Sequence, residues 1–348
     1  MEKSDILRLF LEKGYQVDVE TLNFFAKNEK QLKKFIEEIE NKTAPLTITK
    51  DFVDLTLESD VEINVSQAEK KTVTAEDLAK ILFNKYNIIK KILVAHLDLV
   101  NLLSVSKITD KTKVFSLIGI VREIDTTTGT ITVADDTGEI NLKTDQKILN
   151  EVLLNDVLGF ICEKNHRINI KNIVFPDIPL RRNVKTLNEE KKVIFTEKIS
   201  ENVLHYCEKE KTQCYIFTFS QHAEEGEPTQ NQKIVHIDNN PTTAMISKNF
   251  LIFLFAGSFL KKAMNDRKVD DFLISLLKKR YLNATSIFGN NFINNAFVLE
   301  NVPDIIVVQG LGEAMQANYK GVTLLTLSEN TSWIINLKTR EIIKLNTT

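Results

Sequence analysis

Apolar residues at helical spacing mark the beginning of the chain. Within 1–42 they recur every three or four positions, as Ile6 and Phe10 do, and Gly14 stands where a first helix is expected to end. We expect a compact helical module over 1–42 that is suited to docking. The following segment, 43–73, mixes β-forming residues with charges and has no firm period, which predicts a linker.

A second, stronger helical pattern fills 74–106. Thr74 and Asp77 have the spacing of a capping box, which fixes the start of the helix. One face of this amphipathic segment is apolar and consists of Leu78, Ile81, Leu82, Tyr86, Ile89, Leu93, His96, Leu97 and Val100. We interpret His96 as a core histidine with satisfied hydrogen bonds, because no second type of metal ligand lies nearby.

Over 113–176 the apolar period changes to two. Three strands, a short helix and two further strands are expected, which is the element order of an OB-fold, a five-stranded barrel. Gly119 fits the bend that a barrel needs, and Gly138 is expected to supply a positive φ in a hairpin turn. OB-folds often stack nucleic-acid bases on aromatic side chains, but the strand aromatics here are only Phe115, Phe160 and Phe175. We therefore favour a barrel that docks protein.

Strand and helix patterns alternate over 184–348. Eight apolar stretches predict strands: KKVIFT, QCYIFTFS, QKIVHI, FLIFLFAG, DIIVVQG, GVTLLTL, TSWIINL and EIIKL. Helices are expected near 199–208, 259–264 and 270–282. Because most of these strands are apolar without alternation, both faces of each sheet should be covered, which predicts a layered α/β domain. The whole chain is thus expected to be a multidomain α+β protein.

Composition and charge narrow the function classes only a little. The chain has 348 residues and a formal net charge of -2, so a nucleic-acid-binding surface would have to be local. Cys162, Cys207 and Cys214 are too few for a disulfide framework. The charged N-terminus and the short apolar runs predict neither a signal sequence nor a membrane span. We expect a soluble, cytoplasmic protein with no membrane partner.

No short motif in the sequence carries recognisable chemistry. A zinc site made of His205, Cys207, Cys214 and His222 would have spacings that match no zinc knuckle. The phosphate-binding loop and the dinucleotide, metalloprotease and serine-hydrolase motifs are missing from the sequence. By motif alone we predict no catalytic, cofactor-binding or metal-binding residue.

Taken in order, several segments resemble the small subunit of the archaeal family D DNA polymerase and, more distantly, the B subunits of eukaryotic replicative polymerases. LFLEKGYQVDVETLNFF is similar to that family's N-terminal helical module, and VFSLIGIVREIDTTTGTITVADDTGEINL to its OB strands. Pro176-Asp177-Ile178-Pro179 is similar to the motif at its barrel exit, and V-P-D-I at 302–305 and Y-K-G-V at 319–322 to two later motifs. The resemblance covers nearly the whole chain. It implies that a shortened calcineurin-like phosphoesterase domain follows the barrel.

In that family the phosphoesterase domain is a manganese-dependent 3′-to-5′ exonuclease with two metal ions held by Asp, Asn and His. At the matching positions this chain has Glu197 and Ala223 for aspartates, Gln221 for an asparagine, Ala256, Leu311 and Glu313 for histidines, and His222 as a retained histidine. Asp238 to Pro241 resembles a Ser-Asn-Pro step of the family, and a Gly-Asp strand of the family is missing before Gln221. The resemblance thus implies a degenerate domain with no metal and no cofactor.

The favoured hypothesis is a non-catalytic accessory subunit that binds the large catalytic subunit through its barrel and phosphoesterase-like domain. DNA within the complex, and a sliding clamp or a primase, are the further candidate partners. Two alternatives stay open. One is an active exonuclease with relocated ligands, namely Glu197, His205, His222, Asp238 and Glu313. The other is a single-stranded-DNA-binding protein that uses the barrel, with Arg181 and Arg182 as candidate contacts.

Overall fold

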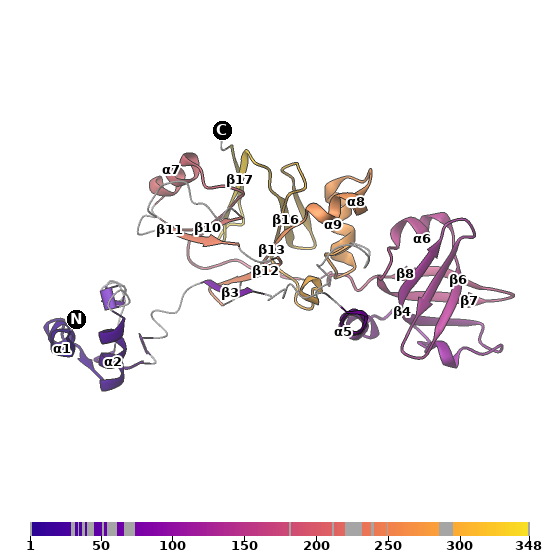
Figure 1. Ribbon diagram of the computed structural model, residues 1–348, viewed down its shortest axis with the longest axis horizontal. Coiled ribbons are helices and arrows are strands. Elements are labelled where there is room, and N and C mark those ends of the chain that lie inside the picture. The colour runs from indigo at the N-terminus through magenta and orange to yellow at the C-terminus, as the bar shows by residue number, and fades with distance from the viewer. Residues whose placement is uncertain are drawn as a thin grey trace. The chain divides into compact units, whose positions relative to one another are not determined.

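The chain is a mixed α+β protein with several sheets. The structure, a computed structural model, describes residues 2–28, 32–33, 35–36, 39, 45–50, 52–53, 61–65, 74–180, 182–210, 212–219, 232–237, 240–248, 250–284 and 295–346. The chain divides into two compact units, Met1–Glu62 and Ile63–Thr348, and each is described by itself (Figure 1).

The first unit has a core of phenylalanine rings between short helices. α1 (Lys3–Glu12) is followed by Lys13 and then by Gly14, which has a φ of 82° as expected of a glycine that stops a helix. α2 (Val19–Lys27) begins at Asp18, whose carboxylate accepts a hydrogen bond of 2.7 Å from the backbone N–H of Thr21. The rings of Phe10 and Phe25 lie 5.8 Å apart between centroids, and the ring of Phe35 lies 5.3 Å from that of Phe25.

Part of the expected linker 43–73 belongs to this core. β1 (Gln16–Val17) pairs in parallel with β2 (Thr47–Ile48), and the side chains of Ile48 and Val53 are fully buried among the phenylalanines. The sequence did not reveal this, because a two-residue strand has no period that can be read.

The second unit contains the long helix α5 (Ala75–Val94), which starts as predicted. The Thr74 hydroxyl accepts a hydrogen bond from Asp77 N at 3.2 Å, and the Asp77 carboxylate accepts one from Thr74 N at 3.2 Å. Tyr86, Ile89 and Leu93 are buried, as the apolar face predicts.

This helix ends well before residue 106. Leu97 is 93% exposed and Val100 is 72% exposed, so the end of the predicted apolar face lies in solvent. His96 lies in the turn after the helix with its Nδ1 3.4 Å from the Asp98 carboxylate, and its side chain is 38% exposed. The interpretation of His96 as a core histidine was therefore wrong.

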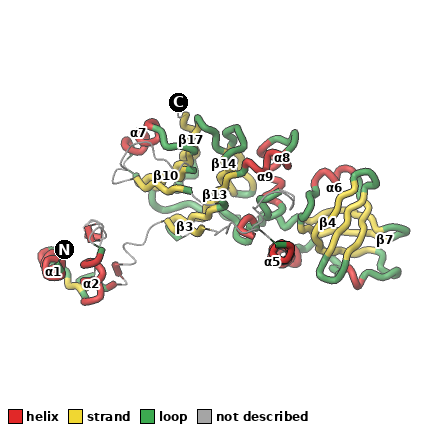
Figure 2. The backbone as a smooth tube through the Cα atoms, in the orientation of Figure 1, coloured by secondary structure: helices red, strands yellow, loops and turns green. Residues whose placement is uncertain are grey.

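Five strands of the second unit close into a barrel. They are β4 (Val114–Asp125), β5 (Thr130–Ala134), β6 (Glu139–Lys143), β7 (Val157–Lys164) and β8 (Ile168–Val174), in the order β4-β5-β6-β8-β7. Along the chain, α6 (Gln146–Glu151) lies between β6 and β7, as expected from the sequence (Figure 2). Phe115 and Phe160 are fully or almost fully buried within the barrel core.

Two glycines of the barrel behave differently from one another. A Cβ on Gly119 would lie 2.2 Å from Cγ1 of Val133, so this position of β4 needs glycine for the close approach of β5. Gly138 does not adopt the positive φ that we expected. Instead, the Asp135 carboxylate holds the turn by accepting hydrogen bonds from the N–H groups of Thr137 and Gly138, at 2.7 Å and 3.1 Å.

Two further sheets make up the rest of this unit. The five-stranded sheet has the order β11 (Gln232–His236), β10 (Gln213–Thr218), β9 (Lys191–Thr196), β17 (Thr331–Asn336) and β18 (Ile342–Asn346). The six-stranded sheet has the order β15 (Gln316–Tyr319), β16 (Val322–Thr326), β14 (Ile305–Gln309), β13 (Phe250–Ala256), β12 (Thr242–Ile246) and β3 (Val61–Val65). All eight predicted strands are present. β3, β12 and β15 were not predicted, and β3 falls in the expected linker.

Helices cover the outer faces of both sheets, as Figure 1 shows. α7 (Glu201–Lys209) packs Val203 and Cys207 against Ile194 of the five-stranded sheet. On the six-stranded sheet lie α8 (Lys261–Met264) and α9 (Val269–Lys278), of which α9 buries Phe272, Leu273 and Leu276. Short 3₁₀ turns occur at η1 (Val105–Lys107), η2 (Ser258–Leu260) and η3 (Asn295–Phe297).

The inner faces of the two sheets meet between these helical layers. Since side chains alternate along a strand, Val193 and Phe195 point away from α7, and both are completely buried. Lys191 Nζ of β9 donates a hydrogen bond of 3.1 Å to Ser247 Oγ, which follows β12. The layered α/β arrangement expected over 184–348 is therefore present.

Candidate functional site

A polar pocket of about 480 Å³ lies where strands of both sheets reach their carboxyl ends. Its lining residues are Glu197, Lys261, Gln309, Gly310, Gly312, Ser328, Glu329 and Asn330. Glu197 follows β9, Gln309 ends β14, and Ser328 follows β16. In sheets with parallel strands this edge is where ligands usually bind.

Hydroxyl groups of neighbouring strands fix the backbone beneath Glu197. Ser332 Oγ donates to Thr196 Oγ1 at 2.8 Å, and Thr218 Oγ1 donates to the carbonyl of Glu197 at 3.1 Å. Burial and the nearby charge of Glu329 raise the pKa of Glu197, while hydrogen bonds from Gln309 and Gly310 oppose that rise. The pocket therefore holds two carboxylates close enough to disfavour each other's charge.

The turn after β14 is the loop that matches the family's Gly-His-x-His motif. Gly310 and Gly312 have φ values of 88° and 102°, which only glycine adopts without strain. Leu311 is buried and packs into the core beside α9, so it does not line the pocket. Glu313 is exposed, and its backbone carbonyl accepts a hydrogen bond of 2.6 Å from Thr326 Oγ1. Neither histidine position of the motif supplies a ligand to the pocket.

Ala256, at the end of β13, occupies another histidine position of the resembled family. Its N–H donates to Asn240 Oδ1 at 3.0 Å, and its carbonyl accepts from Asn240 Nδ2 at 3.0 Å. Both polar ends of the Asn240 amide are thus used to hold the end of β13. This asparagine lies in the step that resembles Ser-Asn-Pro, and here it has a structural role.

The remaining candidate ligands are not brought together. His205 is an exposed residue of α7 whose Nδ1 lies 3.7 Å from Glu208, and it does not line the pocket. Gln221, His222, Ala223 and Asp238 lie outside the described residues. Among the described residues, no group of three or more His, Cys, Asp or Glu side chains is placed to hold a metal ion.

The described side chains therefore do not fit the two metal ions that the phosphoesterase domain of the resembled family holds. A two-metal site needs oxygen and nitrogen ligands converging from several strand ends. This pocket offers Glu197 and Glu329, and it also contains the ammonium group of Lys261. The side chains can hydrogen-bond a polar ligand, but no catalytic step through metal ions can be derived from them.

The zinc alternative fails on geometry as well. Cys207 and Cys214 are both buried against the five-stranded sheet, whereas the His205 side chain is exposed. The hydrogen bond to Cys214, together with burial, raises the pKa of the Cys207 thiol. A neutral, buried thiol is a poor metal ligand and a poor nucleophile.

Four pocket residues escaped the sequence analysis: Lys261, Ser328, Glu329 and Asn330. Each lies in a turn that follows an apolar strand or begins a short helix. Position after a strand was the available signal, and it did not single out these residues from other polar loop residues.

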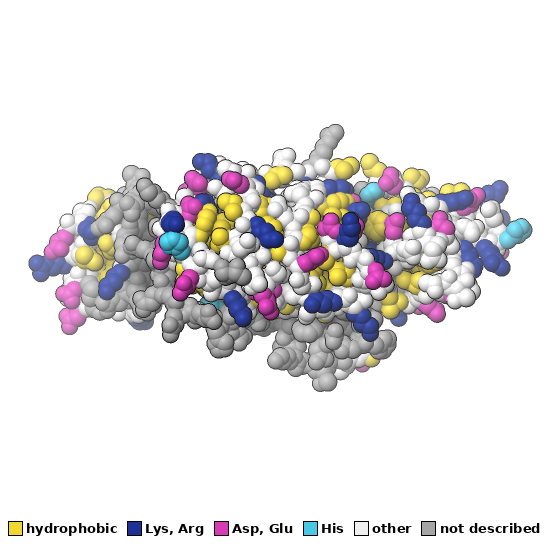
Figure 3. Space-filling view, turned by 90° about the horizontal axis from the view of Figure 1, so that it is seen from above, with side chains coloured by type: hydrophobic (Ala, Val, Ile, Leu, Met, Phe, Trp, Pro, Cys, Tyr) yellow, Lys and Arg dark blue, Asp and Glu magenta, His cyan; other side chains and the backbone are white. Residues whose placement is uncertain are grey.

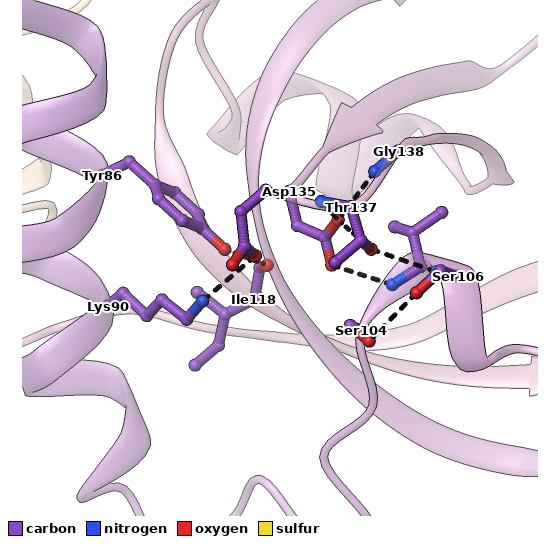
Figure 4. Close-up of polar contacts among 10 residues, drawn as sticks. Tyr86, Lys90, Ser104, Ser106, Ile118, Asp135, Thr137 and Gly138 are labelled. Atoms are coloured by element: carbon purple, nitrogen blue, oxygen red, sulfur yellow. Dashed lines mark hydrogen bonds and ion pairs between the residues drawn. The ribbon is translucent and has the colours of Figure 1, made fainter. Parts of the chain in front are cut away.

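A second, mostly apolar groove of about 250 Å³ lies between α5 and the barrel. Leu82, Phe83 and Tyr86 of the helix face Ile120 and Ala134 of the strands. Figure 4 shows Tyr86 and Lys90 directed toward the barrel, where Tyr86 Oη donates to the Ile118 carbonyl at 3.3 Å.

The rim of this groove carries charges that are already partnered. Lys90 Nζ lies 3.2 Å from the Asp136 carboxylate. Asp135 accepts hydrogen bonds from Thr137 and from the N–H of Val105, the latter at 2.8 Å, so it fixes the turn in Figure 4 to the chain before β4. The groove is thus part of the packing of α5 on the barrel.

Buried lysine side chains join the barrel to the α/β sheets. Lys279 Nζ, at the end of α9, lies 2.7 Å from the carboxylate of Asp156 in the barrel. Lys85 Nζ of α5 donates to the carbonyl of Asn155 at 2.8 Å and lies 3.4 Å from the centre of the Tyr281 ring. Burial lowers the pKa of Lys85 to about 7, which the charge of Asp156 opposes and that of Lys279 reinforces.

Arg182, a candidate DNA contact, is instead a structural residue. Its guanidinium donates to the carbonyls of Pro303 and Val302, at 2.9 Å and 3.0 Å, and pairs with the buried carboxylate of Asp304. Its side chain is 13% exposed, which leaves little of it available to a ligand. Arg181 lies outside the described residues.

Within the described ranges, none of the helices has the length and apolar character needed to cross a membrane.

Comparisons with known proteins add little to these observations. No protein-family model matches the chain. No curated protein matches it either. Among solved structures, a conserved protein of Streptococcus pneumoniae TIGR4, described as a predicted phosphoesterase, is 8% identical, with 46% of this chain and 92% of that chain covered and a TM-score of 0.28. A Thermotoga maritima protein solved by NMR in solution is 11% identical, with 45% and 99% covered and a TM-score of 0.26. At these scores neither likeness carries an argument, and the comparisons place the chain in no family.

Proposed function

We propose that this chain is a non-catalytic accessory subunit of an archaeal family D DNA polymerase and binds the large catalytic subunit. In this proposal the closed five-stranded barrel is an OB-fold, and the two helix-covered sheets are a degenerate calcineurin-like phosphoesterase domain. The sequence resemblance described above is the source of the proposal, and three structural observations support it.

The main support comes from the residues at the positions where the resembled family has metal ligands. Ala256 and Leu311 replace histidines with side chains that cannot bind metal, and Glu313 lies outside the pocket. The scaffold motifs of the same family, by contrast, are engaged in buried or half-buried contacts, as for Asp177 and Asp304. A chain that is selected only to bind a partner protein would lose its metal ligands and keep the residues that build its fold.

The second support is the way in which the barrel is joined to the α/β sheets. Arg280 donates from Nε to the Pro176 carbonyl at 3.1 Å and from Nη2 to the Asp177 carbonyl at 3.3 Å. With the buried ion pair of Lys279 and Asp156, these bonds are made at the end of a single helix, α9. A partner can therefore bind a surface that spans both domains without having to order them first.

The third support concerns the alternative of a stand-alone single-strand binder. Phe115 and Phe160 are buried in the barrel core and cannot stack on bases. Arg182 is held by Asp304. These two rings and this arginine are therefore not available to a nucleic acid, whereas Phe175 is only partly buried and Arg181 lies outside the described residues.

The test of the proposal is co-expression of the full chain with the large catalytic subunit, followed by size-exclusion chromatography. Co-elution as one stoichiometric complex is expected. Elution of this chain alone, with the large subunit folded and soluble, would contradict the proposal.

A nuclease assay tests the non-catalytic part separately. The full chain, alone and in the complex, is expected to leave 3′-ended DNA intact in the presence of manganese. Glu197→Gln and His222→Ala should match the wild-type chain. Degradation that either substitution abolishes would favour the exonuclease with relocated ligands instead.

A further inference from the structure

One end of the barrel carries a cluster of cations that the proposed function does not use. We call it the basic face; its residues are Lys107, Lys111, Lys113, His166 and Arg167, all of them exposed. Figure 3 shows Lys and Arg side chains gathered with a histidine at the barrel's end of the second unit. His166 and Arg167 form the tip of the β7–β8 hairpin, and the lysines lie on the segment that leads into β4.

Lys164 fixes these two segments side by side. Its N–H donates to the Lys113 carbonyl at 2.7 Å, and its Nζ donates to the Thr109 carbonyl at 3.1 Å. The same Nζ lies 3.0 Å from the Asp110 carboxylate. The cations of the basic face therefore lie on one continuous, hydrogen-bonded surface.

The acidic groups next to the basic face are already neutralised. Asp110 is paired with Lys164, and Glu163 is paired with Lys171. In the described part of the chain, Lys107, Lys111, Lys113 and Arg167 have no ion-pair partner. Four positive charges thus remain uncompensated on a protein whose formal net charge is -2. This local excess of positive charge creates a positive electrostatic potential that attracts a polyanion.

We infer that the basic face binds the sugar–phosphate backbone of DNA, without regard to base sequence. Lys and Arg are the side chains that contact phosphates, and contacts of this kind position a nucleic acid without reading it. The barrel aromatics Phe115 and Phe160 lie in the core and Phe175 is partly buried against it, so none of these three rings is fully exposed for bases to stack on. This inference rests on the proposed function, because the polymerase would bring DNA to the barrel.

Four phosphate contacts set the size of the expected salt effect. Each contact releases condensed counterions, so the logarithm of the affinity should fall with the logarithm of salt with a slope of about −3.6 for four contacts. Between 50 and 200 mM salt this slope corresponds to a loss of affinity of about 150-fold.

The experiment measures binding of fluorescein-labelled 30-base-pair duplexes to the full chain by fluorescence anisotropy. Two duplexes of unrelated sequence are compared across the salt range. The test variant carries Lys111→Glu, Lys113→Glu and Arg167→Glu. The control variant carries Lys209→Glu, Lys268→Glu and Lys338→Glu, which are exposed lysines elsewhere in the unit and change the net charge equally.

We expect both duplexes to bind equally well. The test variant should lose affinity by tenfold or more and show a shallower salt slope, while the control variant stays within about threefold of the wild type. No wild-type binding at 50 mM salt, or equal losses in the two variants, would overturn the inference. Both variants should still co-elute with the large catalytic subunit, which separates this result from the test of the proposed function. If only the test variant failed to co-elute and duplex affinity were unchanged, the basic face would be a protein contact and the DNA inference would be wrong.

Discussion

The carboxylate of Asp177 accepts a hydrogen bond of 2.8 Å from the hydroxyl of Tyr319, which lies 142 residues further along the chain. The adjacent Lys320 Nζ lies 2.7 Å from the same carboxylate and donates to the Ile178 carbonyl at 3.0 Å. Two motifs that were noted separately in the sequence, one at the barrel exit and one that runs from the end of β15 to the start of β16, are therefore in direct contact. Ile178 is buried in the core beside α9, so the contacts of Asp177 and Ile178 with Tyr319 and Lys320 fix the path of the chain from the barrel to the sheets.

Tyr319→Phe should destabilise the second unit by about 1–2 kcal/mol, because it removes a hydrogen bond to a charged acceptor. Urea unfolding followed by circular dichroism measures this loss. A double-mutant cycle with Asp177→Asn supplies the control, since two residues in direct contact should show a coupling free energy above about 0.5 kcal/mol. Strictly additive effects would mean that the hydrogen bond contributes nothing to stability.

Gly119→Ala should destabilise the barrel by about 3 kcal/mol or more, because the added Cβ would lie 2.2 Å from Val133 Cγ1 and 2.9 Å from the Ala134 carbonyl oxygen. Gly138→Ala is the matched control in the same barrel. There the nearest atom is 3.4 Å away, and the change should cost less than about 1 kcal/mol. Thermal unfolding of both variants makes the comparison, and equal losses would contradict the close packing of β4 on β5.

The sequence was sufficient for those parts of the fold whose signal is local. The capping box at Thr74 and the eight apolar strands over 184–348 depend on residues within a few positions of each other. The end of α5 was missed because Leu97 and Val100 continue the apolar period, although they lie in solvent. β12 and β15 were missed because pairing with long neighbouring strands, rather than their own composition, makes them strands.

The candidate site was less predictable than the fold. The resemblance identified Glu197 and the turn after β14 as positions at the pocket's edge. It did not indicate that Lys261 and Glu329 would join them, because residues from separate loops meet only through the sheet topology. The motif Val302-Pro303-Asp304-Ile305 likewise did not reveal that Asp304 forms a buried ion pair with Arg182, because the two residues are 122 positions apart in the sequence.

Manganese at 1 mM should leave the melting temperature of the full chain unchanged within about 1 °C. A single site with a dissociation constant of about 10 μM would instead stabilise the folded state by about 2.7 kcal/mol, a shift of several degrees. Differential scanning fluorimetry with and without manganese and EDTA measures the difference. A clear shift in the wild-type chain that Glu197→Gln removes would mean that the pocket holds metal after all.

Lys85 should make the stability of the second unit depend on pH. Burial lowers its pKa from 10.5 to about 7 in the folded state, so unfolding takes up a proton between these two pH values. Stability should therefore rise with pH in this window, by at most about 1.4 kcal/mol per pH unit, and should be lost as pH falls toward 7. Between pH 7.5 and 9.0 the expected gain is about 2 kcal/mol.

Urea unfolding of Lys85→Met at the same pH values isolates this contribution, because the variant keeps the volume of the side chain and removes its charge. Its stability should be higher than that of the wild type near pH 7 and should change little up to pH 9.0. Lys90→Met is the control on the same helix. Lys90 is partly exposed; burial acts to lower its pKa, but its hydrogen bonds and charge interactions with Asp136 and Tyr86 together outweigh burial and raise the pKa. That variant should keep the slope of the wild type. A slope that survives in Lys85→Met would show that other groups titrate in this window and that Lys85 stays charged in the folded protein.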